Sequence, residues 1–84
     1  MVVDKREVER VCEAVAGILR EERERRGLAM LTVAERAGVS QQMVSYVERG
    51  IRRPTLEMAL RIAKAIGVEL AEVLVRAEKL SGGR

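Results

Sequence analysis

The chain has 84 residues and a formal net charge of +3, and this length supports one domain with one hydrophobic core. Apolar residues make up 48% of the chain but aromatic residues only 1%, so the core must be aliphatic, which favours packed helices. Without histidine, and with Cys12 as the single cysteine, the sequence excludes an internal disulfide, a zinc cluster and an evident acid–base or nucleophilic centre. We therefore expect a protein that is not an enzyme and needs no cofactor.

Targeting and membrane signals are also missing from the sequence. The N-terminal residues turn charged at Asp4 without a signal-peptide pattern, and no apolar run approaches the roughly 18 residues of a membrane span. These features predict a reduced, cytoplasmic protein with no membrane partner.

A first helix is expected from an N-cap at Asp4, which has capping-box spacing to Glu7, to a C-terminal cap at Gly27. The charged run from Arg20 to Arg26 predicts a largely solvated end with ion pairs between residues four apart. Apolar residues recur along the helix at three- and four-residue steps and form one stripe, namely Val8, Val11, Cys12, Val15, Ile18 and Leu19.

Two short helices are expected next, joined by a tight turn at Gly38. The first covers roughly residues 30–37 and begins either at Met30 or at a capping box slightly later. The second follows an N-cap at Ser40 and ends near Arg49. A turn this short makes two helices cross at about 90–120°, which requires small or aliphatic side chains where they meet. The expected inward residues are Val33, Ala34, Ala37, Val44 and Val47.

The last two helices are separated by Gly67, with Pro54 and Thr55 introducing the first of them and a frayed tail beginning at Ser81 after the second. Their apolar positions are Leu56, Leu60, Ile62, Ala63 and Ile66 in the fourth helix, and Leu70, Val73, Leu74, Ala77 and Leu80 in the fifth. The sequence therefore predicts an all-α, compact domain of five helices.

The helix after Ser40 has an outward face that is almost uncharged, in a chain with 35% charged residues. A glutamine amide carries donors and an acceptor that match N6 and N7 of adenine in the major groove, and a helix N-terminus attracts phosphate without lysine. Arg52 and Arg53 follow, with no acidic residue between positions 49 and 56, which indicates a phosphate-binding patch. The pattern favours Gln41 and Gln42 as residues that read bases.

Five motifs follow one another in an order and spacing that cover about two-thirds of the chain. They are Arg23-x-x-x-Gly27-Leu28, Val33-Ala34-Glu35-Arg36-Ala37-Gly38-Val39-Ser40, Val44-Ser45-Tyr46-Val47-Glu48-Arg49-Gly50, Arg53-Pro54-Thr55, and Ile62-Ala63-Lys64-Ala65-Ile66-Gly67-Val68. Through these motifs, residues 18–75 resemble the lambda-repressor/Cro-like (XRE-type) helix-turn-helix family. The resemblance implies a five-helix DNA-binding domain that acts as a homodimer on a pseudo-palindromic operator of double-stranded DNA. Residues 1–17 then extend the first helix, and residues 76–84 hold the end of the last helix and the tail.

The resemblance also implies roles for single residues. Arg23 and Glu48 match a pair that commonly bridges the first and third helices, and we assign them a structural role. Two positions depart from the family pattern, because Met30 replaces a usual glutamine and Ala29 a usual serine or threonine, which weakens the expected anchoring of the second helix. The implied base contacts are Gln41, Gln42, Ser45 and Tyr46, and the implied phosphate contacts are Ser40, Arg49, Arg52 and Arg53.

The first helix begins before the family's domain normally does, and the apolar residues of this extension are expected to be buried against another surface. Either the last helix or a second subunit can supply it. The apolar strip of the last helix, formed by Val73, Ala77 and Leu80, is also the candidate dimer interface.

Two functions are compatible with these patterns. The first is a sequence-specific transcriptional regulator, a homodimeric repressor that occupies a promoter by placing the helix Ser40–Arg49 in the major groove. The alternative is a protein-interaction module of the same fold, an antitoxin-like protein or an adaptor with a protein partner, in which DNA binding is weak or secondary. The paired glutamines favour the first function, whereas Met30 and the apolar extension leave room for the second.

Overall fold

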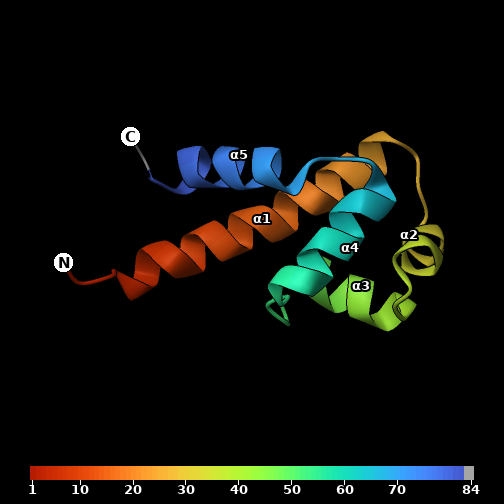
Figure 1. The fold of residues 1–84 in the computed structure, drawn as a ribbon, viewed down its shortest axis with the longest axis horizontal. Coiled ribbons are helices and arrows are strands. Elements are labelled where there is room, and N and C mark those ends of the chain that lie inside the picture. The colour runs from red at the N-terminus through yellow and green to blue at the C-terminus, as the bar shows by residue number, and fades with distance from the viewer. Residues whose placement is uncertain (83–84) are drawn as a thin grey trace.

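The computed structural model describes residues 1–82, and this part of the chain folds into five helices without a strand (Figure 1), which confirms the expected all-α class. None of these helices is long and apolar enough to cross a bilayer. The helices are α1 (Lys5–Arg25), α2 (Met30–Ala37), α3 (Gln41–Glu48), α4 (Leu56–Ile66) and α5 (Leu70–Gly82).

Polar side chains cap three of these helices at the positions expected from the sequence. Asp4, Ser40 and Thr55 each accept a hydrogen bond from a backbone N–H in the first turn, at 2.9, 3.0 and 3.1 Å. Such caps satisfy helix N–H groups that have no partner within the helix. α2 begins at Met30, the earlier of its two expected starts, although Ala29 offers no side-chain cap.

Helix α5 runs back along α1, so that its C-terminal end and the N-terminal end of α1 lie on the same side of the molecule (Figure 1). Val73 and Ala77 are fully buried there, within a single chain. This corrects the expected dimer strip, because of its three residues only Leu80 is exposed and available to another subunit.

The end of α5 also differs from expectation. The Ser81 hydroxyl donates to the carbonyl oxygen of Ala77 at 2.6 Å, and the helix continues through Gly82 instead of ending before Ser81. The remainder of the expected tail, Gly83 and Arg84, lies outside the described residues.

The core is aliphatic, as the composition predicts. Its most deeply buried large side chains come from every helix and are Leu19, Val33, Val44, Val47, Ile62 and Val73. Four leucines among the apolar positions of α4 and α5 are exposed: Leu56, Leu60, Leu74 and Leu80. The apolar arc of each helix is wider than the surface its neighbours cover, so these leucines form apolar surface.

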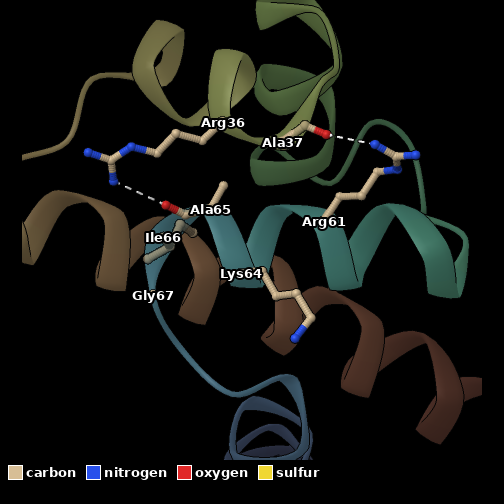
Figure 2. Close-up of a pocket in the computed structure, with 7 residues that line it drawn as sticks. All are labelled: Arg36, Ala37, Arg61, Lys64, Ala65, Ile66 and Gly67. Carbon is tan, nitrogen blue, oxygen red and sulfur yellow. Dashed lines mark hydrogen bonds between the residues drawn. The ribbon is translucent and has the colours of Figure 1, made fainter.

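Helices α2 and α4 each supply an arginine to the C-terminal end of the other (Figure 2). Arg36 of α2 donates to the carbonyl oxygen of Ala65 at 3.3 Å, and Arg61 of α4 donates to that of Ala37 at 3.0 Å. Both guanidinium groups meet carbonyls that lack helical partners, at the negative end of a helix dipole. The exchange fixes α2 on α4 in a way that the sequence pattern did not reveal.

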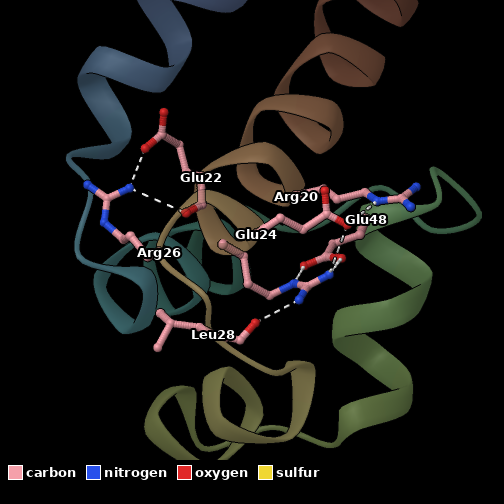
Figure 3. A network of polar contacts seen from close by, with 7 residues as sticks. Arg20, Glu22, Glu24, Arg26, Leu28 and Glu48 are labelled. Carbon is pink, nitrogen blue, oxygen red and sulfur yellow. Dashed lines mark hydrogen bonds and ion pairs between the residues drawn. The ribbon is translucent and has the colours of Figure 1, made fainter.

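A second polar network joins α1 to α5 around Glu22. Its carboxylate accepts from Arg76 of α5 at 2.9 Å and from Arg25 at 3.0 Å. Arg26 also donates to it, as Figure 3 shows. The hydrogen bonds from Arg26 and Arg76 lower the pKa of Glu22 from 4.5 to about 2. The network therefore holds a carboxylate ionised at the junction of the two helices.

Burial of Glu22 corrects the expectation that the charged end of α1 is largely solvated, because only 5% of this residue is exposed. The spacing already contained the signal, since Glu22 continues the stripe of Val15 and Leu19 by three- and four-residue steps. Glu22 was not assigned to the stripe because it is charged, although a charged residue can be buried when it is paired.

We expect Glu22 to make the fold acid-sensitive in a defined pH window. Because its folded pKa is lowered, its contribution to stability is full above pH 4.5 and is lost as the pH falls to about 2. Thermal melting of the wild type and Glu22→Gln should differ most near neutral pH and converge over that window. Glu21→Gln, an exposed neighbour, is the control, and a difference that stayed constant down to the acid end would contradict the assignment.

Candidate nucleic-acid interface

The turn between α2 and α3 is built around Gly38. This residue has φ 73°, the left-handed conformation that favours glycine, and the N–H of Val39 donates back to the carbonyl oxygen of Ala34 at 3.0 Å. A Cβ at Gly38 would lie 3.2 Å from Nη1 of Arg61, so the site is also narrow. Ala34 is buried at the crossing, as expected for a steep meeting of two helices.

Helix α3 is attached to the core by one of its faces. Val44 and Val47 are fully buried on this face, and Glu48 beside them has a side chain that is only 2% exposed. Gln41 and Gln42, which begin the helix, lie on the exposed side. The helix is therefore held firmly while its N-terminal residues remain accessible.

The ion pair expected between Arg23 and Glu48 is present (Figure 3). Nε and Nη2 of Arg23 donate to the two carboxylate oxygens of Glu48 at 2.6 and 3.0 Å, and Nη1 donates to the carbonyl oxygen of Leu28 at 2.7 Å. The hydrogen bond with Glu48 raises the pKa of Arg23 further. Arg23 thus connects α1, the start of the following loop and the end of α3.

The accessible side of α3 carries neutral polar groups that are ordered by contacts within the helix. Nε2 of Gln42 donates to the hydroxyl oxygen of Tyr46 at 2.7 Å. One turn further on, Nη1 of Arg49 donates to the hydroxyl oxygen of Ser45 at 3.3 Å. Of the expected base-contacting residues, Gln41 and Gln42 are exposed, Ser45 and Tyr46 are partly exposed, and the amide of Gln42 is hydrogen-bonded to Tyr46.

The two arginines of the loop between α3 and α4 have different partners. The guanidinium carbon of Arg52 lies 5.9 Å from the centre of the Tyr46 ring, over its face. Arg53 pairs with Glu9 of α1, with 3.4 Å between Nη2 and Oε2. Residues 49–56 contain no acidic residue, and this partner from the first helix was not anticipated.

A hollow of about 210 Å³ adjoins this surface between α1, α2 and α3. Met30, which stands where the family usually has a polar residue, lines it together with Ser45 and Arg49 and packs partly against the core. Among residues 1–82, no three potential metal-binding side chains come together. Ser45 and Arg49 offer hydrogen bonding and positive charge at this surface.

A short helix, a left-handed glycine turn and a second helix with one buried and one polar face define a helix-turn-helix domain. Family comparison is consistent with this class, because a helix-turn-helix family model matches residues 19–73. The chain belongs to the XRE-type helix-turn-helix family, as its motifs indicated.

Several curated proteins are similar to this chain. Uncharacterized HTH-type transcriptional regulators from two strains of Mycobacterium tuberculosis are 42% identical over 59 residues, which covers 70% of this chain and 42% of theirs. One from Methanothermobacter thermautotrophicus is 42% identical over 55 residues, covering 66% of this chain and 80% of its own. The chain thus spans about two fifths of the mycobacterial relatives and most of the archaeal one.

Removing either partner of the buried ion pair should be strongly destabilising. Arg23→Ala or Glu48→Ala leaves a buried charge unpaired, and we expect a loss of about 3–5 kcal/mol in the free energy of unfolding, measured with denaturant. The double change Arg23→Met with Glu48→Leu should recover much of this loss because no charge remains. Arg20→Ala breaks only an exposed pair with Glu24 and should cost less than about 1 kcal/mol. Single variants no less stable than this control would refute the structural role.

Proposed function

We propose that this protein is a sequence-specific, double-stranded DNA-binding transcriptional regulator that reads the major groove with α3. The observation that carries the proposal is the division of this helix between a buried anchoring face and a neutral polar outer face. The membership in the helix-turn-helix family and the names of the relatives support it. A cytoplasmic repressor that acts by occupying a promoter is the simplest regulator of this kind.

In this proposal the bases are read by Gln41, Gln42, Ser45 and Tyr46. Glutamine can bond both N6 and N7 of adenine, and neutral side chains discriminate between bases without attracting every sequence through charge. The hydrogen bond from Gln42 to Tyr46 supports this role, since an amide already held in one orientation loses less freedom on binding.

The DNA backbone is bound, in the same proposal, by residues at both ends of α3. Ser40 lies at the helix N-terminus, where free N–H groups and the helix dipole favour a phosphate. Arg49, Arg52 and Arg53 follow at the other end and supply the positive charge. All three arginines are exposed, which supports their availability to phosphate.

We also propose that the protein acts as a homodimer, through a surface other than the expected strip of α5. Leu56 and Leu60 of α4 and Leu74 of α5 are 70%, 38% and 39% exposed. Leu56 and Leu74 border a mainly apolar hollow of about 180 Å³ that also reaches α1. A second copy of the chain is the occupant that a pseudo-palindromic operator requires, with two half-sites roughly 34–36 Å apart.

Replacing Gln42 by Ala tests base reading. Because the side chain is exposed, the variant should fold normally, and it should lose about 1–3 kcal/mol of discrimination at one base position. Selection of duplexes from a random pool, followed by competition binding, measures this effect. Arg52→Ala is the contrasting variant, since it should weaken binding to all DNA sequences alike and make the affinity less dependent on salt. An unchanged sequence preference for Gln42→Ala would exclude direct reading by this residue.

Two charge substitutions on α5 distinguish the possible dimer surfaces. Leu74→Glu should convert the dimer into a monomer, because it places a carboxylate in the apolar contact. Leu80→Glu, at the far end of the same helix, should leave the dimer intact. Light scattering after gel filtration reports the mass of each variant. A dimer disrupted only by Leu80→Glu would locate the interface at the end of α5, and a monomeric wild type would exclude the homodimer.

A further inference from the structure

The first half of α1 lies against the loop that carries two of the proposed phosphate-binding arginines. The family match begins at residue 19, so the part of α1 from Lys5 to Ile18 precedes it. A small hollow of about 70 Å³ is enclosed between this part of α1 and the loop. Its lining includes Cys12, Glu13 and Ala16 from α1 and Gly50, Arg53 and Pro54 from the loop. The extension is therefore a direct neighbour of the DNA-binding loop.

Arg53 differs from the other two arginines in the partner that it has in the free protein. Arg49 bonds to a hydroxyl and Arg52 lies over an aromatic ring, whereas Arg53 faces the carboxylate of Glu9 at 3.4 Å. Within the described residues, Arg53 is the only one of the three with a carboxylate partner. The side chains of Arg53 and Glu9 are 58% and 40% exposed, so water reaches the pair.

A carboxylate and a phosphate use the same N–H groups of a guanidinium. Glu9 holds its negative charge 3.4 Å from Nη2 of Arg53, so a DNA phosphate that binds this guanidinium must either displace the carboxylate or bind beside its repelling charge. The ion pair between Arg53 and Glu9 is exposed and weak, so breaking it costs little free energy.

We propose that Glu9 competes with a DNA phosphate for Arg53, so that the extension of α1 lowers the affinity for DNA. The inference rests on the proposed function, because it requires Arg53 to contact phosphate. Phosphate contacts carry no sequence information, and the reduction therefore applies equally to the operator and to unrelated DNA. Glu9 sets how tightly the protein binds without changing what it reads.

The test compares Glu9→Gln with Glu7→Gln in the full chain. Both changes remove one negative charge from the first turns of α1, but Glu7 makes no ion pair within residues 1–82. The comparison therefore separates the specific pair from the general effect of net charge. Affinities are measured by fluorescence anisotropy on a random-sequence duplex and on the duplex obtained by selection, over a series of salt concentrations. Thermal melting verifies that both variants are folded.

At low salt we expect Glu9→Gln to bind both duplexes about two- to fivefold more tightly than Glu7→Gln. The advantage should shrink as salt rises, because salt screens an exposed pair. In an Arg53→Ala background, Glu9→Gln and Glu7→Gln should bind equally.

Three outcomes would overturn the inference. Equal affinities of the two single variants at every salt concentration would show no competition. Weaker binding by Glu9→Gln would mean that Glu9 positions Arg53 for DNA. An advantage that persisted without Arg53 would assign the effect to another group. Arg53→Ala separates the two proposals: if it weakens binding while Glu9→Gln has no effect, only the competition fails, and if it has no effect, the phosphate contact itself fails.

Discussion

The buried ion pair between Arg23 and Glu48 is the constraint on which the rest of the interface depends. Two charges removed from water are stable only while they are paired. Here the guanidinium of Arg23 donates to both carboxylate oxygens of Glu48 and also to the carbonyl oxygen of Leu28. A shift of α3 along α1 by one residue would leave both charges buried and unpaired. Val44 and Val47 supply apolar burial but tolerate many aliphatic neighbours. The ion pair therefore selects one register of α3 from several that apolar packing would allow.

A fixed register decides which residues of α3 reach the outside. With Glu48 directed at α1, the helical period turns Gln42 away from the core. Gln41 lies seven residues before Glu48, on the same side of the helix, and is exposed because it is the first residue of α3. The steep turn at Gly38 and the arginine exchange between α2 and α4 hold the start of α3, while the ion pair holds its end. A helix of eight residues is too short to be stable alone, so its rigidity comes from these attachments.

Features that depend on local sequence could be predicted from the residues, whereas pairings between distant segments could not, apart from Arg23 with Glu48, which the family resemblance implied. Helix order, the caps at Ser40 and Thr55 and the inward valines of α3 follow from periodicity and cap chemistry, and they agree with the structure. The spacing of Glu22 was compatible with burial, but its partner across the fold, Arg76, is 54 residues away and could not be identified from the sequence. The exposure of Leu74 was missed for a related reason, since an apolar stripe shows what a helix can bury but not how much of it a neighbour covers.

Within residues 1–82, three ion pairs of α1 reach other parts of the fold, and they show how one helix combines fold and interface. Near its C-terminus, Glu22 reaches α5 and Arg23 reaches α3, whereas Glu9 reaches the loop of Arg53 about 20 Å earlier along the helix. The contact of Arg23 is buried and that of Glu22 is partly buried, so they fix positions. The contact of Glu9 is exposed, so it can break when a stronger anion arrives. Under the proposed competition, a segment that precedes the family match would adjust the affinity for DNA, whereas α3, a helix within the matched residues, would read the bases. If affinity and base reading depend on different segments, a substitution in α1 can change the affinity without any change to the residues proposed to face the bases.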